Sequence, residues 1–140
     1  MSTMGQRTSG RSVNQLVAMI FGVVYVAVGL LGFAVTGGVG LTETEGRNLI
    51  IFELNPLHNI VHLLIGALLL VGSRSLASAK AVNIGVGAAY LLVGILGLVV
   101  SGGSANILAL NAPDHVLHFA SALLLLGVGV TPDRRTRALV

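Results

Sequence analysis

All four histidines of the chain lie in two short stretches that resemble each other. His58 and His62 are four residues apart, and His115 and His118 are three apart. On a helix, either spacing places both rings on one face. Imidazole nitrogens bind zinc, copper and iron. If the two pairs converge, the four histidines can hold a transition metal, with Glu53 or Asp114 as a further ligand or as an acceptor behind the ligands.

Two other uses of the histidines are open. His62 and His118 occupy equivalent places in the two stretches, so they are candidates for the axial ligands of a haem. Alternatively, each ring fills a notch lined by glycine and hydrogen-bonds a neighbouring group, as polar residues inside membranes usually do. Counting depth along the helices places these two rings opposite Gly29 and Gly32 and opposite Gly94 and Gly97. We favour this structural role, which predicts no resident cofactor.

Proton passage and catalysis are less well supported by the residues. Histidines inside a membrane can relay protons, but no acidic or basic residue lies deep in the apolar segments. Ser121 lies one turn from His118, yet no acid is placed at that depth to orient a base. Tyr25 and Tyr90 are expected to pack and to hydrogen-bond between helices. We therefore expect a protein that is not an enzyme.

The histidine stretches belong to a longer internal repeat. Residues 54–62 match residues 110–118 at a shift of 56, and residues 25–32 match residues 90–97 at a shift of 65. We call positions related by these shifts matched positions. The pattern predicts two parallel helical-hairpin repeats related by a pseudo-two-fold axis along the membrane normal. The glycines that recur on the first helix of each repeat would allow neighbouring helices to approach closely.

The composition is that of an integral membrane protein. The chain has 140 residues, of which 54% are hydrophobic and 9% charged, whereas soluble domains carry about 25% charged residues. Apolar runs long enough to cross roughly 30 Å of hydrocarbon recur along it. The chain has no cysteine, which excludes disulfides and thiolate ligands.

The pattern predicts an all-α, polytopic protein with four transmembrane helices. Repeat 1 covers 13–73, with helices at about 14–36 and 56–73. Repeat 2 covers 80–130, with helices at about 81–101 and 112–130. The segment 1–12 is a polar N-terminus, and 131–140 is a basic tail. The short apolar segment 49–54 and its counterpart 105–110 are expected at the membrane interface.

Charge sets the orientation. Seven of the eight basic residues fall on one side of a four-span chain, and four of the five acids fall on the other. Basic residues favour the cytoplasmic side, so both termini are expected in the cytoplasm, where the basic fringe would meet anionic lipids. The basic residues are placed against the bilayer, and we expect no nucleic-acid partner.

The segment from Asn55 to Gly66, preceded by Tyr25 to Phe33 with Gly29 and Gly32, resembles a bacterial membrane family. This family is the domain of unknown function 4383, common in actinobacteria, and the resemblance covers about 13–130. It implies a small four-span protein of the bacterial inner membrane and brings no activity or site residues. We expect a structural or accessory protein that partners other membrane subunits or its own copies, with metal or haem binding as the alternative.

Overall fold

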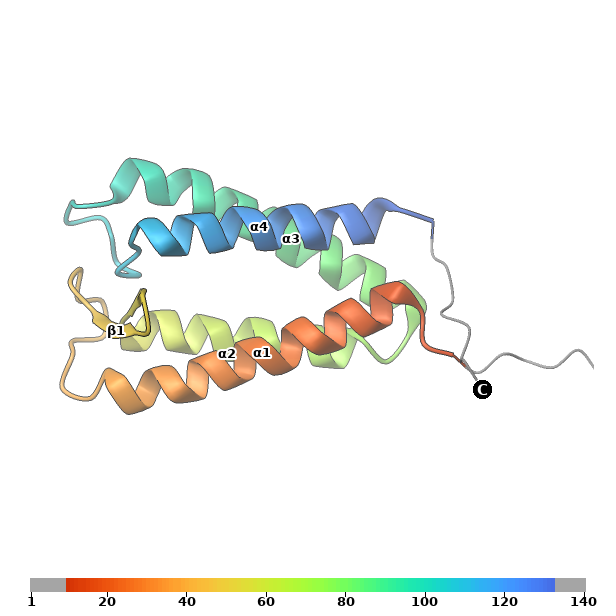
Figure 1. The fold of residues 1–140 in the computed structure, drawn as a ribbon, viewed down its shortest axis with the longest axis horizontal. Helices are drawn as coiled ribbons and strands as arrows, with labels where there is room; N and C mark the ends of the chain where they lie inside the picture. Colours follow the sequence, from red (N-terminus) through yellow and green to blue (C-terminus); the bar gives the residue numbers. More distant parts are fainter. Residues whose placement is uncertain (1–9, 133–140) are drawn as a thin grey trace, which may run out of the picture.

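The structure is a computed structural model that describes residues 10–132. The outer parts of the predicted polar N-terminus and basic tail, residues 1–9 and 133–140, lie outside the described residues. The described chain forms four helices and one small hairpin of two antiparallel strands (Figure 1). In chain order these are α1 (Val13–Val35), β1 (Arg47–Leu49), β2 (Phe52–Leu54), α2 (Pro56–Gly72), α3 (Leu76–Val100) and α4 (Ala112–Val130).

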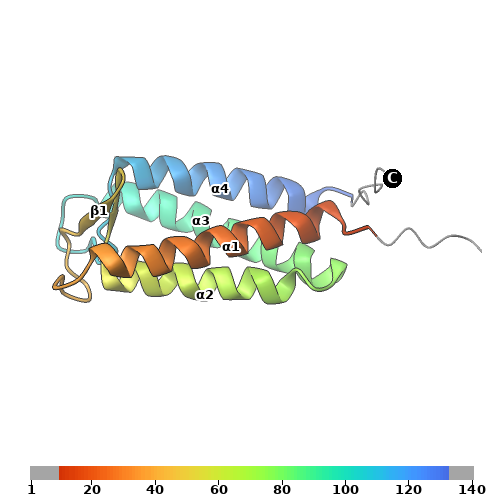
Figure 2. The same cartoon turned by 60° about the horizontal axis from the view of Figure 1, so that its bottom comes forward.

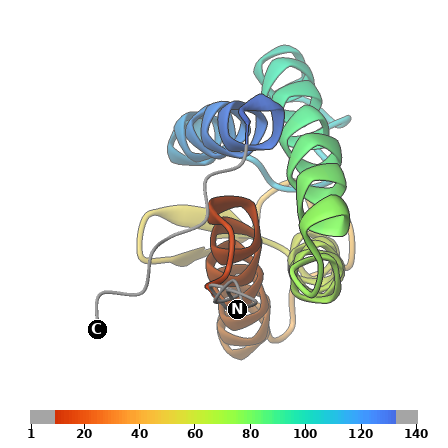
Figure 3. The ribbon, with the colours of Figure 1, turned by 90° about the vertical axis from the view of Figure 1, so that its right-hand side faces the viewer.

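The four helices lie side by side as two hairpins, with α1 packed mainly on α2 and α3 mainly on α4 (Figures 1 and 2). Figure 3 shows the bundle along its length, with the β-hairpin extending to one side. The loop that holds the β-hairpin and the loop between α3 and α4 lie at one end of the bundle. The start of α1, the end of α4 and the α2–α3 connection lie at the other end.

The helices have the length and surface of membrane spans. Within residues 10–132, α1, α3 and α4 are long and apolar enough to cross a membrane, and α2 is a shorter apolar helix. Its 17 residues span about 26 Å at the usual helical rise. Each helix exposes large apolar side chains, including Leu30, Leu64, Leu98 and Leu123. A bundle with apolar side chains on its outside is suited to lipid rather than water. The fold is therefore that of a helical, membrane-type protein.

Asparagine caps begin α2 and α4 and also join the two helical hairpins. The side chain of Asn55 accepts a hydrogen bond from the backbone N–H of His58, and Asn111 does the same for Asp114. The Asn55 amide also donates to the carbonyl oxygen of Ile107 at 2.8 Å, and the Asn111 amide donates to that of Ile51 at 2.9 Å. Each cap thus reaches into the loop of the opposite half.

Two details differ from the sequence prediction. Helix α3 begins at Leu76, five residues before the predicted start at 81, because Ser75 caps it and accepts from the backbone N–H of Ser78. The charge of Lys80 indicates where the apolar segment begins, which need not be where the helix begins. The segment 49–54 forms most of the β-hairpin, whereas its counterpart 105–110 forms turns.

Glycines bring the backbones within each helical hairpin into contact. A Cβ atom placed on Gly66 of α2 would lie 2.8 Å from the backbone nitrogen of Val26 and 2.9 Å from the carbonyl oxygen of Gly22. A Cβ on Gly87 of α3 would lie 2.9 Å from the backbone nitrogen of Leu126. Only glycine allows such an approach, and small residues have this role in membrane helices generally.

This packing predicts the effect of adding one methyl group. Gly66→Ala should lower the free energy of unfolding by about 1–3 kcal/mol, because the added carbon meets backbone atoms that cannot move away. Thermal unfolding in mild detergent, followed by circular dichroism, measures the change. Gly85→Ala is the matched control, since a Cβ there has no heavy atom within 4 Å. Equal stability of the two variants would contradict the packing described.

Candidate functional site

Three of the four histidines and both tyrosines meet in the middle of the bundle. We call Tyr25, His58, His62, Tyr90 and His118 the aromatic cluster. The rings of His58 and His62 stack with centroids 4.6 Å apart. Tyr25 packs against His62 at 5.6 Å, Tyr90 against His118 at 5.1 Å, and the two tyrosine rings lie 5.3 Å apart. All four helices therefore contribute to one cluster.

The polar atoms of the aromatic cluster are buried without partners. No cluster member is more than 5% exposed. Both tyrosine hydroxyls and the Nδ1 atoms of all three histidines have no hydrogen-bond partner within residues 10–132. The hydroxyls of Ser121 and Tyr90 do lie close to that of Tyr25, and backbone groups of Leu108 and Glu53 lie close to the His58 ring. A buried polar atom without a partner costs about 1–3 kcal/mol, and most such atoms in native proteins are satisfied. Buried atoms without a partner among the described residues also occur outside the cluster, at Asn59, Asn83 and His115, so the cluster is distinguished by holding five of them together.

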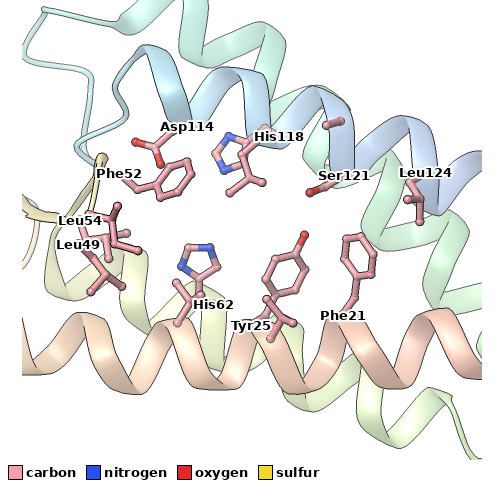
Figure 4. Close-up of a pocket in the computed structure, with 15 residues that line it drawn as sticks. Phe21, Tyr25, Leu49, Phe52, Leu54, His62, Asp114, His118, Ser121 and Leu124 are labelled. Atoms are coloured by element: carbon pink, nitrogen blue, oxygen red, sulfur yellow. The ribbon is translucent and has the colours of Figure 1, made fainter.

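One face of the cluster lines a cavity of about 350 Å³ between α1 and α4, beneath the β-hairpin (Figure 4). Its polar wall consists of Tyr25, His62, Asp114, His118 and Ser121. In Figure 4, the tyrosine and histidine side chains of this wall project into the space between the helices. The remaining wall is apolar. Cavities of this size with few convergent polar groups are typical of small-molecule sites.

The mouth of the cavity lies on the apolar surface of the bundle. Four large apolar residues of its lining, Val24, Ile50, Leu117 and Leu124, are also exposed on the outside. Val24 belongs to α1, Leu117 and Leu124 belong to α4, and Ile50 lies at the tip of the β-hairpin. A molecule that enters between α1 and α4 therefore comes from the side that lipid would cover.

The fourth histidine, His115, lies apart from the cluster. Its ring covers Gly97, and its Nε2 atom lies 2.6 Å from the hydroxyl oxygen of Ser101. At the matched positions of the first half, Asn59 covers Gly32 and donates to the hydroxyl oxygen of Thr36 at 2.9 Å. These two residues fasten α2 to α1 and α4 to α3.

The expectation that His62 and His118 face the glycine notches is therefore wrong. Asn59 and Leu63 lie over Gly29 and Gly32, while His115, Phe119 and Leu110 lie over Gly94 and Gly97. Residues three apart on a helix point about 60° apart. Asn59 consequently faces the partner within its own hairpin, and His62 faces the interface between the two hairpins.

The structure does not bring the four histidines into one metal site. In residues 10–132 no group of three or more histidine, aspartate or glutamate side chains is arranged to hold a metal ion. The rings of His58 and His62 are stacked and tilted by 18° to each other. The lone pairs of their ring nitrogens therefore lie in nearly parallel planes. The rings of His62 and His118 each pack on a tyrosine. The hypothesis that these two histidines are the axial ligands of a haem stays a prediction.

A second, smaller cavity corresponds to the first by sequence. It measures about 40 Å³, lies between α2 and α3, and is lined by nine residues. Every one of the nine occupies a position matched to a lining residue of the large cavity. The main substitutions are Ile65 for Ser121, His58 for Asp114 and Leu108 for Phe52. The bulk of Ile65 in place of a serine agrees with the smaller volume.

The sequence singled out the histidines, three of which lie in the aromatic cluster, but did not predict the cavity beside them. Tyr25 was expected to pack and to hydrogen-bond between helices, and Ser121 was considered only as a catalytic group. Of the β-hairpin strands, only Glu53 was considered, as a metal ligand or an acceptor behind the ligands. A signal for Ser121 was present, because its matched residue is Ile65 while most neighbours keep their character. A position where the two matched residues differ in size or polarity therefore indicates which half has a distinct role.

Comparison with known proteins identifies a family and nothing further. No curated protein and no solved structure matches the chain significantly. A family model described as Domain of unknown function (DUF4383) matches residues 15–131. This range includes all four helices apart from the first residues of α1 and the aromatic cluster in full. The chain therefore belongs to the DUF4383 family, as the residues of its first repeat predicted.

Proposed function

We propose that this protein binds a lipophilic small molecule inside the membrane, in the cavity between α1 and α4, and does not catalyse a reaction itself. The observation that supports this most directly is the set of buried polar atoms without partners on the cavity wall, in Tyr25, His62 and His118. A bound molecule with a polar group would satisfy them. The apolar mouth would admit the rest of that molecule from the bilayer.

Binding is a better account of the site than catalysis. The carboxyl group of Asp114 is engaged in the cap of α4, where its Oδ2 atom accepts from the backbone N–H of Asn111 at 2.9 Å. It is therefore not held as the partner that orients a catalytic histidine. The tyrosine and histidine groups can bind and position a molecule without further machinery. As an accessory protein, the chain would hold this molecule for other membrane subunits or for a second copy of itself.

The proposed setting is the cytoplasmic membrane of a bacterium, with four spans and both termini in the cytoplasm. Arg74 and Lys80 lie near the end of the bundle where α1 starts and α4 ends, whereas Glu43, Glu45 and Glu53 belong to the loop at the other end. This distribution agrees with the preference of basic residues for the cytoplasmic side and for anionic lipids.

We also propose that the two halves arose by duplication. The matched contacts support it: Asn59 on Gly32 corresponds to His115 on Gly97, and the bond from Asn55 to Ile107 corresponds to that from Asn111 to Ile51. Tyr25 and Tyr90, which are also matched, touch each other near the centre. A pseudo-two-fold axis along the membrane normal accounts for all three pairs.

The orientation can be measured with single cysteines, because the natural chain has none. Glu45→Cys and Ala77→Cys place thiols at exposed positions at opposite ends of the bundle. In intact bacterial cells without an outer membrane barrier, a membrane-impermeant maleimide should label Cys at 45 directly and Cys at 77 only after permeabilisation. The reverse pattern would invert the proposed topology, and equal labelling of both would rule out four complete spans.

The binding function can be tested by extraction. Protein purified from native membranes in mild detergent should retain a small lipophilic molecule at close to one per chain, detected by mass spectrometry of an organic extract. Ser121→Ile, which installs the bulk found at the matched position 65, should fill the cavity and lose the molecule. Ala77→Cys, far from the cavity, should retain it. Failure to find such a species in the wild-type protein, or its equal presence in Ser121→Ile, would refute the proposal.

Elemental analysis and an absorption spectrum of the same preparations test the alternative. Metal near one equivalent, or a haem band, that disappears in His62→Ala and His118→Ala would replace the proposed function by a cofactor-binding one.

A further inference from the structure

The chemistry of the cavity wall indicates what kind of molecule fits it. Resting on the proposed function, we infer that the ligand is an isoprenoid quinone, a neutral flat ring with two carbonyl oxygens and a long apolar tail. Hydrogen bonds from Tyr25 and from the histidines would hold the ring, and the tail would leave through the mouth between α1 and α4.

The charge of the cavity wall favours a neutral ligand. The cavity lining, as described within residues 10–132, includes no lysine or arginine, and its one ionisable acid is Asp114. Phosphate and carboxylate groups are bound through arginine, lysine or dense backbone N–H groups, because a buried anion needs compensation. Phospholipid headgroups and fatty acids therefore match this wall poorly. A neutral polar group matches it well.

The hydrogen-bond donors of the cavity wall lie at more than one place. Tyr25 and Ser121 lie on facing helices and carry hydroxyl groups on one part of the wall (Figure 4). His62 and His118 lie beside them, nearer to Phe52, and each has an Nδ1 atom without a partner. A neutral imidazole can donate from one nitrogen, and a hydroxyl can donate its proton. Donors at more than one place suit a molecule with more than one acceptor, such as the two carbonyls of a quinone.

The aromatic rings in the cavity lining favour a flat ligand. The rings of Phe21 and Phe52 stand at opposite ends of the cavity in Figure 4, and the rings of Tyr25, His62 and His118 lie between them. Aromatic walls favour flat ligands through stacked and edge-on contacts. Beyond the rings, Val24, Leu117 and Leu124 lead to the outer surface, where an isoprenoid tail would join the lipid.

The duplication supplies an internal comparison for this inference. Tyr90 is matched to Tyr25 and is equally buried, but it lines only the small cavity, whose volume of about 40 Å³ is too little for a ring. Removal of one hydroxyl should therefore matter at Tyr25 and not at Tyr90. A general loss of stability would affect both positions, whereas loss of a ligand contact would affect one.

The experiment uses the full chain, purified and delipidated in mild detergent, with decylubiquinone as the probe. The two tyrosines are the only strongly fluorescent residues, since the chain has no tryptophan, so quenching of their emission reports on the site. In wild-type protein the probe should quench this emission saturably and raise the thermal unfolding midpoint. Tyr25→Phe should weaken binding roughly threefold to tenfold, as expected for one lost hydrogen bond.

Three controls make the outcome decisive. Tyr90→Phe, which keeps Tyr25 as the reporter, should bind like the wild type, and Ser121→Ile should not bind. Farnesol has an isoprenoid tail without a quinone ring, and oleate has an anionic head; neither should compete at concentrations that saturate the quinone. Unchanged affinity in Tyr25→Phe, or an equal loss in Tyr90→Phe, would overturn the assigned contact and with it the quinone pose.

The quinone inference and the proposed function fail separately. Binding of farnesol or oleate at least as tight as that of decylubiquinone, with loss in Ser121→Ile, would reject the quinone and retain a lipophilic site. Absence of binding for all three probes, together with a wild-type extract that contains no retained molecule, would reject both.

Discussion

Backbone contact at glycines is the constraint on which the rest of this structure depends. In the first helical hairpin, Gly22 and Gly66 allow α1 and α2 to lie directly against each other. In the second, Gly87 does the same for α3 and α4. Between the hairpins the space is filled by side chains from all four helices, which range from Ala18 and Ala79 to Tyr25 and Tyr90. The tight interfaces hold the shape of the bundle. The looser interface is where rings, polar atoms and cavities can be accommodated.

This division separates two groups of buried polar residues. Asn59 and His115 lie on the glycine faces and are bonded to Thr36 and Ser101, so they serve the hairpins. The aromatic cluster lies between the hairpins, where its hydroxyls and Nδ1 atoms have no partner among the described residues. In a bilayer, a polar group without a partner is costly. These groups, beside a cavity whose mouth lies on the apolar surface of the bundle, are the basis of the proposed binding function.

The two halves use the same plan with different results. Matched residues line both cavities, yet one is several times larger than the other. The larger one lies beneath the β-hairpin, which belongs to the longer of the two loops at that end of the bundle, and it has Ser121 where the smaller one has Ile65. At these matched positions one half is closely packed, whereas the other half leaves a cavity between α1 and α4, beside the aromatic cluster.

Local sequence patterns determined much of this fold. Apolar runs, an asparagine with a proline just after it at the start of α2 (Asn55, Pro56) and of α4 (Asn111, Pro113), and the glycines that follow α1 predicted the helices, because caps and helix length depend on neighbouring residues. The family followed from the residues between Asn55 and Gly66 and between Tyr25 and Phe33. The rotation of each helix was decided only by tertiary structure. Apolar residues surround these helices on every side, so their pattern does not say which face is inward. The place over the glycines that was expected for His62 is therefore taken by Asn59, three residues earlier. The β-hairpin and the cavity, likewise, exist only because segments distant in sequence pack together, and no local pattern encodes the volume left between α1 and α4.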